Sequence, residues 1–181
     1  MKALKFAIPA LVLSLAAAGC ILVSGQFLID FELPNFTAVT DTTVTRQVVD
    51  LNTESDYVDH EDELKSIADI AVLGKITNNA ASAIGVEVWM TPTLTTLADE
   101  TAIKATAIKL WGPLTLAAGP GTSKTIDWNE SAGLFKGPGK TALLNEVKGD
   151  GQFTIYAIGD AATYDISVEN GVLALVLEFA K

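Results

Sequence analysis

The sequence predicts a mainly β protein in which a single domain folds as a β-sandwich, with one or two short helices in its connections. Three observations support this fold class. Apolar residues recur at every second position over short stretches, which is typical of half-buried strands. Turn-forming Gly, Pro and Asn residues separate these stretches. The regular alternation of strands and helices that marks a parallel α/β sheet does not occur.

The N-terminal half of the domain begins with alternating apolar and acidic side chains that end at Pro34. A second stretch is rich in Thr and Val, which favour strands. Acidic residues at the start of 59–67 suit the positive end of a helix dipole, so a short helix is expected there. The period of two then returns on both sides of Asn78-Asn79. The strands predicted in this half are residues 26–33, 36–51, 69–77 and 84–90.

The C-terminal half contains one ambiguous stretch, Thr101–Trp111, which fits a helix by its apolar spacing and a strand by its Thr and Ile content. The strand is the favoured interpretation. A helix is predicted over 140–148, capped by Gly149. Asn170-Gly171 lies between two strand-like runs and predicts a tight hairpin. The other strands predicted in this half are residues 124–128, 152–158, 163–169 and 172–179.

Residues 70–90, a strand, Asn78-Asn79 and a second strand, are similar to part of the LEA-type (WHy) domains. This resemblance implies a single LEA-type or immunoglobulin-like sandwich, placed over residues 26–181. It implies no site residue.

The first residues have the layout of a secretory signal peptide. Lys2 and Lys5 precede an apolar run, 6–18, that ends in small residues. A plain cut after the alanines and an uncleaved anchor helix are both open alternatives.

The sequence Ala17-Ala18-Gly19-Cys20 resembles the lipobox of bacterial lipoproteins, although Ala17 stands where Leu is usual. The resemblance implies removal of residues 1–19 and lipidation of Cys20, with 20–25 as a lipidated tether. It therefore implies a membrane anchor in the cell envelope. Ile21 stands where an Asp would favour retention in the inner membrane. The expected location is therefore the outer membrane, facing the periplasm or the surface.

The composition limits the possible partners. The chain has a formal net charge of −10 at pH 7. The leader carries two lysines and no acidic residue, so the chain without its leader is more acidic still. Such an acidic surface repels phosphate backbones, so nucleic acid is not an expected partner. Envelope proteins are possible partners. Cys20 is the only cysteine, which excludes an intramolecular disulfide.

Oxygen-bearing side chains alternate in the acidic segment 50–63, a spacing similar to that of a calcium-binding EF-hand loop. Ser55 occupies the position where that loop needs Gly, and a strand precedes it. The alternative is a solvated loop that leads into a helix. The lone His60 has no second histidine or thiol with which to bind a transition metal. The candidate calcium ligands are Asp50, Asn52, Glu54, Asp56 and Glu61.

Aromatic side chains offer another candidate site, a platform for glycan or peptide. Trp128 and Tyr164 fall on predicted inward faces, whereas Trp89 is expected to be exposed. The other candidates are Trp111, Tyr57 and Tyr156.

No nucleophile–base pair and no cofactor motif is recognisable in the sequence. Gly137–Thr141 lacks the spacing of a phosphate loop. The sequence thus predicts a non-enzymatic envelope lipoprotein with a binding or structural role. The alternative is a ligand-binding lipoprotein that takes calcium or a glycan.

Overall fold

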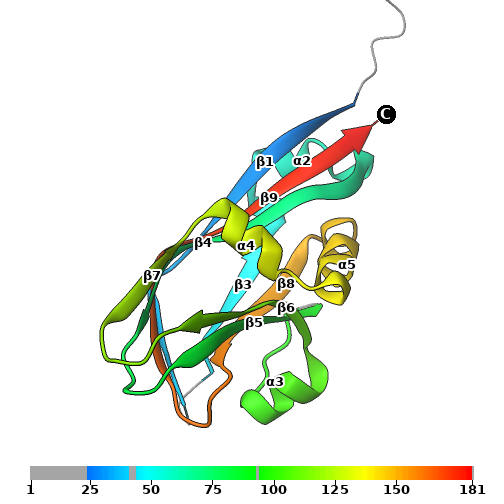
Figure 1. The fold of residues 1–181 in the computed structure, drawn as a ribbon. Coiled ribbons are helices and arrows are strands. Elements are labelled where there is room, and N and C mark those ends of the chain that lie inside the picture. The colour runs from blue at the N-terminus through cyan, green and yellow to red at the C-terminus, as the bar shows by residue number, and fades with distance from the viewer. Residues whose placement is uncertain (1–23, 41–43, 93, 181) are drawn as a thin grey trace, which may run out of the picture.

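The computed structural model describes residues 24–40, 44–92 and 94–180, and it confirms the predicted fold class. Two antiparallel sheets face each other, with short helices in the connections between strands (Figure 1). The predicted leader and Cys20 lie outside the described residues. The first strand already includes Ser24 and Gly25, which the sequence assigned to the tether.

The first sheet has the strand order β1-β9-β4-β7, and β2 extends the β1 edge by pairing with β9 as well. The second sheet has the order β3-β8-β5-β6. The strands of the first sheet are β1 (Ser24–Leu33), β2 (Phe36–Val39), β4 (Leu64–Asn78), β7 (Thr122–Ile126) and β9 (Asp165–Ala180). Those of the second are β3 (Arg46–Asp50), β5 (Ile84–Pro92), β6 (Ile108–Leu116) and β8 (Gln152–Gly159).

The helices occupy the connections, and in the described part of the chain none is long and apolar enough to cross a membrane. In Figure 1, α4 lies beside β4 and α3 lies at the far end of the second sheet. The helices are η1 (Leu51–Thr53), α2 (Ser55–Val58), η2 (Glu61–Glu63), α3 (Glu100–Thr106), α4 (Trp128–Leu134) and α5 (Gly137–Val147).

The hairpin predicted at Asn170-Gly171 is wrong, because β9 runs through these residues as one long strand. Asn170 does adopt a positive φ of 52°, but here it forms a bulge that shifts the register between β9 and β4. The Asn170 N–H donates to Asn35 Oδ1 (2.8 Å), in the break between β1 and β2. The Asn-Gly signal thus marks a bend shared by neighbouring strands.

Gly74 of β4 lies opposite this bend, with a φ of 137°. A Cβ there would lie 3.1 Å from the Asn170 carbonyl oxygen, so the close approach of the two strands requires glycine. The first sheet therefore bends along a line that passes through Gly74, Asn170 and the β1–β2 break.

Two further predictions of secondary structure, one helix and one strand, need correction. The helix predicted over 59–67 is displaced: α2 precedes it, and Leu64 already begins β4. Thr101–Trp111 is neither all strand nor all helix, because α3 ends at Thr106 and β6 begins at Ile108. Asp99 caps α3 by accepting from the Ala102 N–H (2.8 Å), and this local hydrogen bond outweighs the strand propensity of the segment.

The core lies between the sheets and is built from the inward-facing alternate residues of the strands. Its largest fully buried side chain is Trp111 of β6. The ring nitrogen of Trp111 donates to the Ser131 carbonyl and hydroxyl oxygens, each at 3.1 Å. Because Ser131 belongs to α4, this pair of bonds fixes the indole against the first sheet and thereby shapes the space beside it.

Candidate functional site

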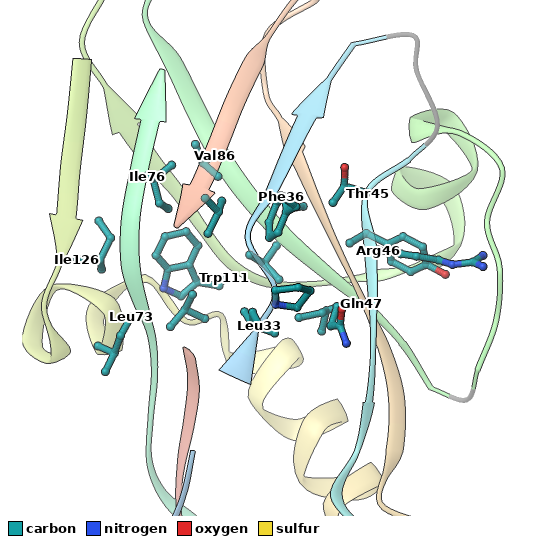
Figure 2. Close-up of a pocket in the computed structure, with 17 residues that line it drawn as sticks. Leu33, Phe36, Thr45, Arg46, Gln47, Leu73, Ile76, Val86, Trp111 and Ile126 are labelled. Carbon is teal, nitrogen blue, oxygen red and sulfur yellow. The ribbon is translucent and has the colours of Figure 1, made fainter. Parts of the chain in front are cut away.

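An apolar pocket lies between the two sheets, with a volume of about 70 Å³. Figure 2 shows Trp111, Val86, Ile76 and Ile126 around this space. Trp111 and Val86 come from the second sheet, while Ile76 and Ile126 come from the first. The period of two on each strand turns these side chains inward, and the pocket is the part of the interior that they leave unfilled.

The mouth of the pocket lies between two sheet edges. Leu33 and Phe36, on either side of the β1–β2 break, line one lip, and Thr45 and Gln47, at the start of β3, line the other. Thr45 Oγ1 donates across the mouth to the Thr37 carbonyl (3.1 Å). The lips belong to different sheets, so no strand ladder seals the gap between them.

The lining favours binding over chemistry. Nearly all of its side chains are apolar, and the Tyr156 hydroxyl is occupied as a donor to the Thr95 carbonyl. Arg46 is the only charged residue of the lining, and its guanidinium points away from the cavity in Figure 2. An apolar group entering here gains the transfer free energy of its buried surface, about 0.8 kcal/mol per methylene.

The predicted calcium ligands are spread from the end of β3 to the start of η2, and Asp50, the last residue of β3, is the N-cap of η1. Asp50 Oδ1 accepts from the Asn52 backbone and side-chain N–H groups at 3.1 and 2.9 Å. Asp50 Oδ2 accepts from Gln152 Nε2 (3.0 Å). These bonds tie the end of β3 to the start of β8.

The other predicted ligands are placed at helix starts: Glu54 is the N-cap of α2, Asp56 lies in its first turn, and Glu61 begins η2. Across the described residues, no group of three or more His, Cys, Asp or Glu side chains is arranged to hold a metal ion. The calcium site stays a prediction from the sequence. His60 stacks on Phe179, with ring centroids 4.4 Å apart.

Tyr57 is the buried centre of the acidic segment, only 1% exposed, and its hydroxyl donates to the Val147 carbonyl (2.9 Å). Burial raises the pKa of Tyr57 above its ordinary value of 10.0, and the charges of Glu61, Asp150 and Asp50 raise it further. Because the unfolded chain releases this proton first, the stability from Tyr57 is intact below about pH 10 and is lost as the pH rises through the raised pKa.

We therefore expect the free energy of unfolding to fall at alkaline pH, and Tyr57→Phe to reduce that fall. Urea unfolding of the wild type and of Tyr57→Phe from pH 8 to 11 measures how steeply the free energy of unfolding falls with pH. An unchanged slope in Tyr57→Phe would contradict the assignment.

The aromatic residues do not form an exposed platform. Trp89 was expected to be exposed, but it is partly buried against the core. Its ring nitrogen donates to Glu87 Oε2 (3.0 Å), and Lys109 Nζ lies 5.0 Å from the ring centroid. Lys109 also pairs with Glu87 at 2.5 Å. On the outer face of the second sheet, the charges of Glu87 and Lys109 are thus paired with each other, and the Trp89 ring nitrogen already has an acceptor.

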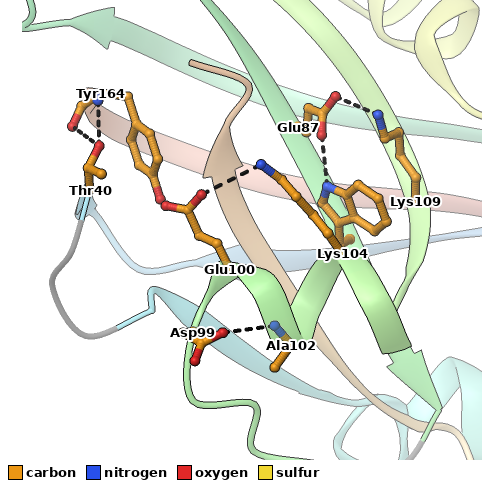
Figure 3. Close-up of polar contacts among 9 residues, drawn as sticks. Thr40, Glu87, Asp99, Glu100, Ala102, Lys104, Lys109 and Tyr164 are labelled. Carbon is orange, nitrogen blue, oxygen red and sulfur yellow. Dashed lines mark hydrogen bonds and ion pairs between the residues drawn. The ribbon is translucent and has the colours of Figure 1, made fainter. Parts of the chain in front are cut away.

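The remaining predicted aromatics serve packing. Trp128 begins α4 and donates to Asp69 Oδ2 (2.6 Å), so the inward strand position predicted for it is wrong. Tyr164 is buried, as predicted, and its backbone N–H donates to Thr40 Oγ1 (2.5 Å), a contact visible in Figure 3. The pocket itself was missed by sequence reasoning, because alternation reveals which residues face inward and not how completely they fill the space.

Comparison with known proteins leaves the chain without a family. No protein-family model matches it, and no curated protein matches it. Among solved structures, it is similar to a chain of the heated full particle of Israeli acute paralysis virus, with 8% identity and a TM-score of 0.34. That match covers 84% of this chain and 74% of the viral chain.

Proposed function

We propose that this protein is a lipid-anchored, non-enzymatic protein of the cell envelope whose sandwich binds an apolar ligand in the pocket between its sheets. The observation that carries the binding role is the apolar space between two unsealed sheet edges. The lipobox-like Ala17-Ala18-Gly19-Cys20 supports the anchor, and the outer membrane remains the proposed location. Partnership with other envelope proteins stays a prediction from the sequence.

The unfilled space has a stability cost that supports a binding role. Cavities destabilise a core by about 24 cal/mol per Å³, so a 70 Å³ pocket costs about 2 kcal/mol relative to a filled interior. Filling it would need only a larger side chain at one lining position, such as Ala157. A cavity that is easily filled and is nevertheless open fits a ligand site.

Filling the pocket tests this function directly. Ala157→Leu places additional carbon atoms in the space, so we expect the melting temperature to stay level or rise and the binding of a small apolar ligand to fall at least tenfold. NMR titration with dissolved xenon, an apolar atom that enters cavities of this kind, measures the binding. Ala105→Leu, the same change at an exposed position of α3, is the control and should leave binding unchanged.

Two outcomes would contradict the proposal. Wild-type protein that takes up no xenon would refute the binding role outright. Ala157→Leu protein that is stably folded and binds as tightly as the wild type would place the ligand elsewhere.

A further inference from the structure

We infer that the free edge of β1 binds an extended peptide segment whose side chains alternate between apolar and basic, so that the segment adds a strand to the first sheet. This inference goes beyond the proposed binding of an apolar ligand and does not depend on the pocket.

The edge of β1 is long and regular. Its ten residues, Ser24–Leu33, pair with β9 one for one and without a register shift. The strand forms a rim of the first sheet (Figure 1), and across the described residues its backbone makes no hydrogen bond outside this ladder. In an antiparallel pair, every second residue turns its N–H and C=O away from the partner strand. These groups of β1 are therefore available to another strand.

The other edge strands are protected in ways that β1 is not. β2, β3 and β7 have four or five residues each, and the last two carry a basic side chain, Arg46 and Lys124. β6 contains Pro113, which has no N–H, and its register with β5 shifts twice. Short length, basic residues, proline and bulges all hinder pairing at an edge. β1 contains no basic residue and no proline, and its ladder has no bulge.

The inner face of this edge requires apolar partners. Three side chains of β1 pack against the core and are only partly buried at the rim, namely Phe27, Phe31 and Leu33. An added strand places every second side chain on this same face. Apolar residues at those positions would cover the exposed part of the three side chains, as in other complexes formed by strand addition.

The outer face of the edge is acidic and requires basic partners. Asp30 and Glu32 of β1 are exposed, and Glu178 of β9 lies opposite Gln26. Hydrogen bonds from Ser66 and Gln26 hold the pKa of the Glu178 carboxyl below its ordinary value of 4.5, so this group is charged at neutral pH. Neither β1 nor the stretch of β9 that pairs with it contains Lys or Arg. Basic side chains of an added strand would therefore meet carboxylates across the ladder.

Charge also decides against a second copy of this chain as the occupant. A second copy would bring the same acidic edge and a further net charge of −10. Like charges at an interface oppose association, whereas a basic segment is attracted both by the edge and by the chain as a whole.

Two peptides of opposite charge test the partner chemistry. A ten-residue peptide in which Lys and Val alternate is the probe, and the same peptide with Glu in place of Lys is its control. Calorimetric titration of the protein at low ionic strength measures both. We expect the Lys-Val peptide to bind and the Glu-Val peptide to bind about tenfold more weakly or less. A Lys-Val peptide that does not bind would overturn the inference, and so would equal binding of the two peptides.

Charge reversal on the strand separates the edge from the net charge of the chain. Asp30→Lys combined with Glu32→Lys changes two exposed side chains, and we expect it to weaken binding of the Lys-Val peptide about tenfold. The control is Asp56→Lys combined with Asp62→Lys, which makes the same change in net charge at exposed positions outside the strand. Equal losses in the two double variants would show that the peptide responds to net charge alone, which would overturn the assignment to β1.

Amide hydrogen exchange followed by NMR locates the bound peptide. In the free protein, we expect alternate N–H groups of β1 to be protected by β9 and the others to exchange rapidly. Addition of the Lys-Val peptide should protect those others. Protection that appears elsewhere and leaves β1 unchanged would overturn the inference, as would protection of β1 that rises with protein concentration and needs no peptide. Xenon uptake by the pocket should be the same in both double variants, so a failed peptide test leaves the proposed function standing.

Discussion

Replacing Asn78 with alanine is expected to lower the free energy of unfolding by about 3 kcal/mol or more. Asn78 is completely buried at the end of β4. Its Nδ2 donates to the carbonyl oxygens of Ser82 (2.8 Å) and Ala117 (3.0 Å), and its Oδ1 accepts from the Ala80 N–H (2.9 Å). Each bond contributes about 1 kcal/mol, and buried groups that lose their partner cost more.

The effect is large because Asn78 joins three segments. Asn78 is the last residue of β4, where the chain leaves the first sheet. Its side chain bonds Ser82, in the turn that leads into β5 of the second sheet, and Ala117, the residue that follows β6. Removing the side chain therefore loosens the connection between the sheets as well as one turn.

Urea unfolding of Asn78→Ala measures this change, with the neighbouring Asn79→Ala as the matched control. Asn79 is only partly buried and bonds the side chains of Asp165 (2.9 Å) and Ser167 (2.8 Å), which can turn to water when it is removed. We expect it to cost about 1 kcal/mol. Equal losses at the two positions would contradict the role assigned to Asn78.

Cys20→Ser is expected to move the protein from the membrane fraction to the soluble fraction almost completely. If the cysteine carries acyl chains, each buried methylene contributes about 0.8 kcal/mol to membrane binding, and two or more chains hold firmly. The strongly acidic chain offers no compensating attraction to anionic lipids. Loss of the thiol therefore removes the anchor.

Fractionation followed by mass analysis of the N-terminus checks this expectation, with Ser14→Ala in the same leader as the control. The wild type and the control should begin at a lipidated Cys20. A Cys20→Ser protein that stays in the membrane with its leader attached would show that the apolar segment 6–18 is the anchor.

The sequence predicted those strands whose alternation is strong and local. The strands predicted at 84–90 and 152–158 correspond to β5 and β8, and the helix predicted at 140–148 corresponds to α5. In each, the periodic pattern and the end signals agree. The errors arose where a local signal has two structural uses, as at Asn170-Gly171, which suits a hairpin turn and a bulge equally well.

The pocket could not be predicted, because it depends on how two sheets pack across a distance. Trp111 lies at the end of the ambiguous stretch 101–111, and its orientation depends on a hydrogen bond to Ser131 of α4, twenty residues away in the sequence. Pro34 predicted the end of a strand. Only the pairing of both β1 and β2 with β9 shows that the β1–β2 break lies at an edge of the first sheet, beside the β3 edge of the second.

The central claim is that the interior between the sheets binds an apolar ligand, and methyl NMR of the mature protein during titration with xenon tests it most directly. We predict that the shifts concentrate on the methyl groups of Val86, Val88 and Val168, which line the pocket. Shifts confined to exposed Leu28, Val48 and Leu94, with the interior methyl groups unmoved, would contradict it.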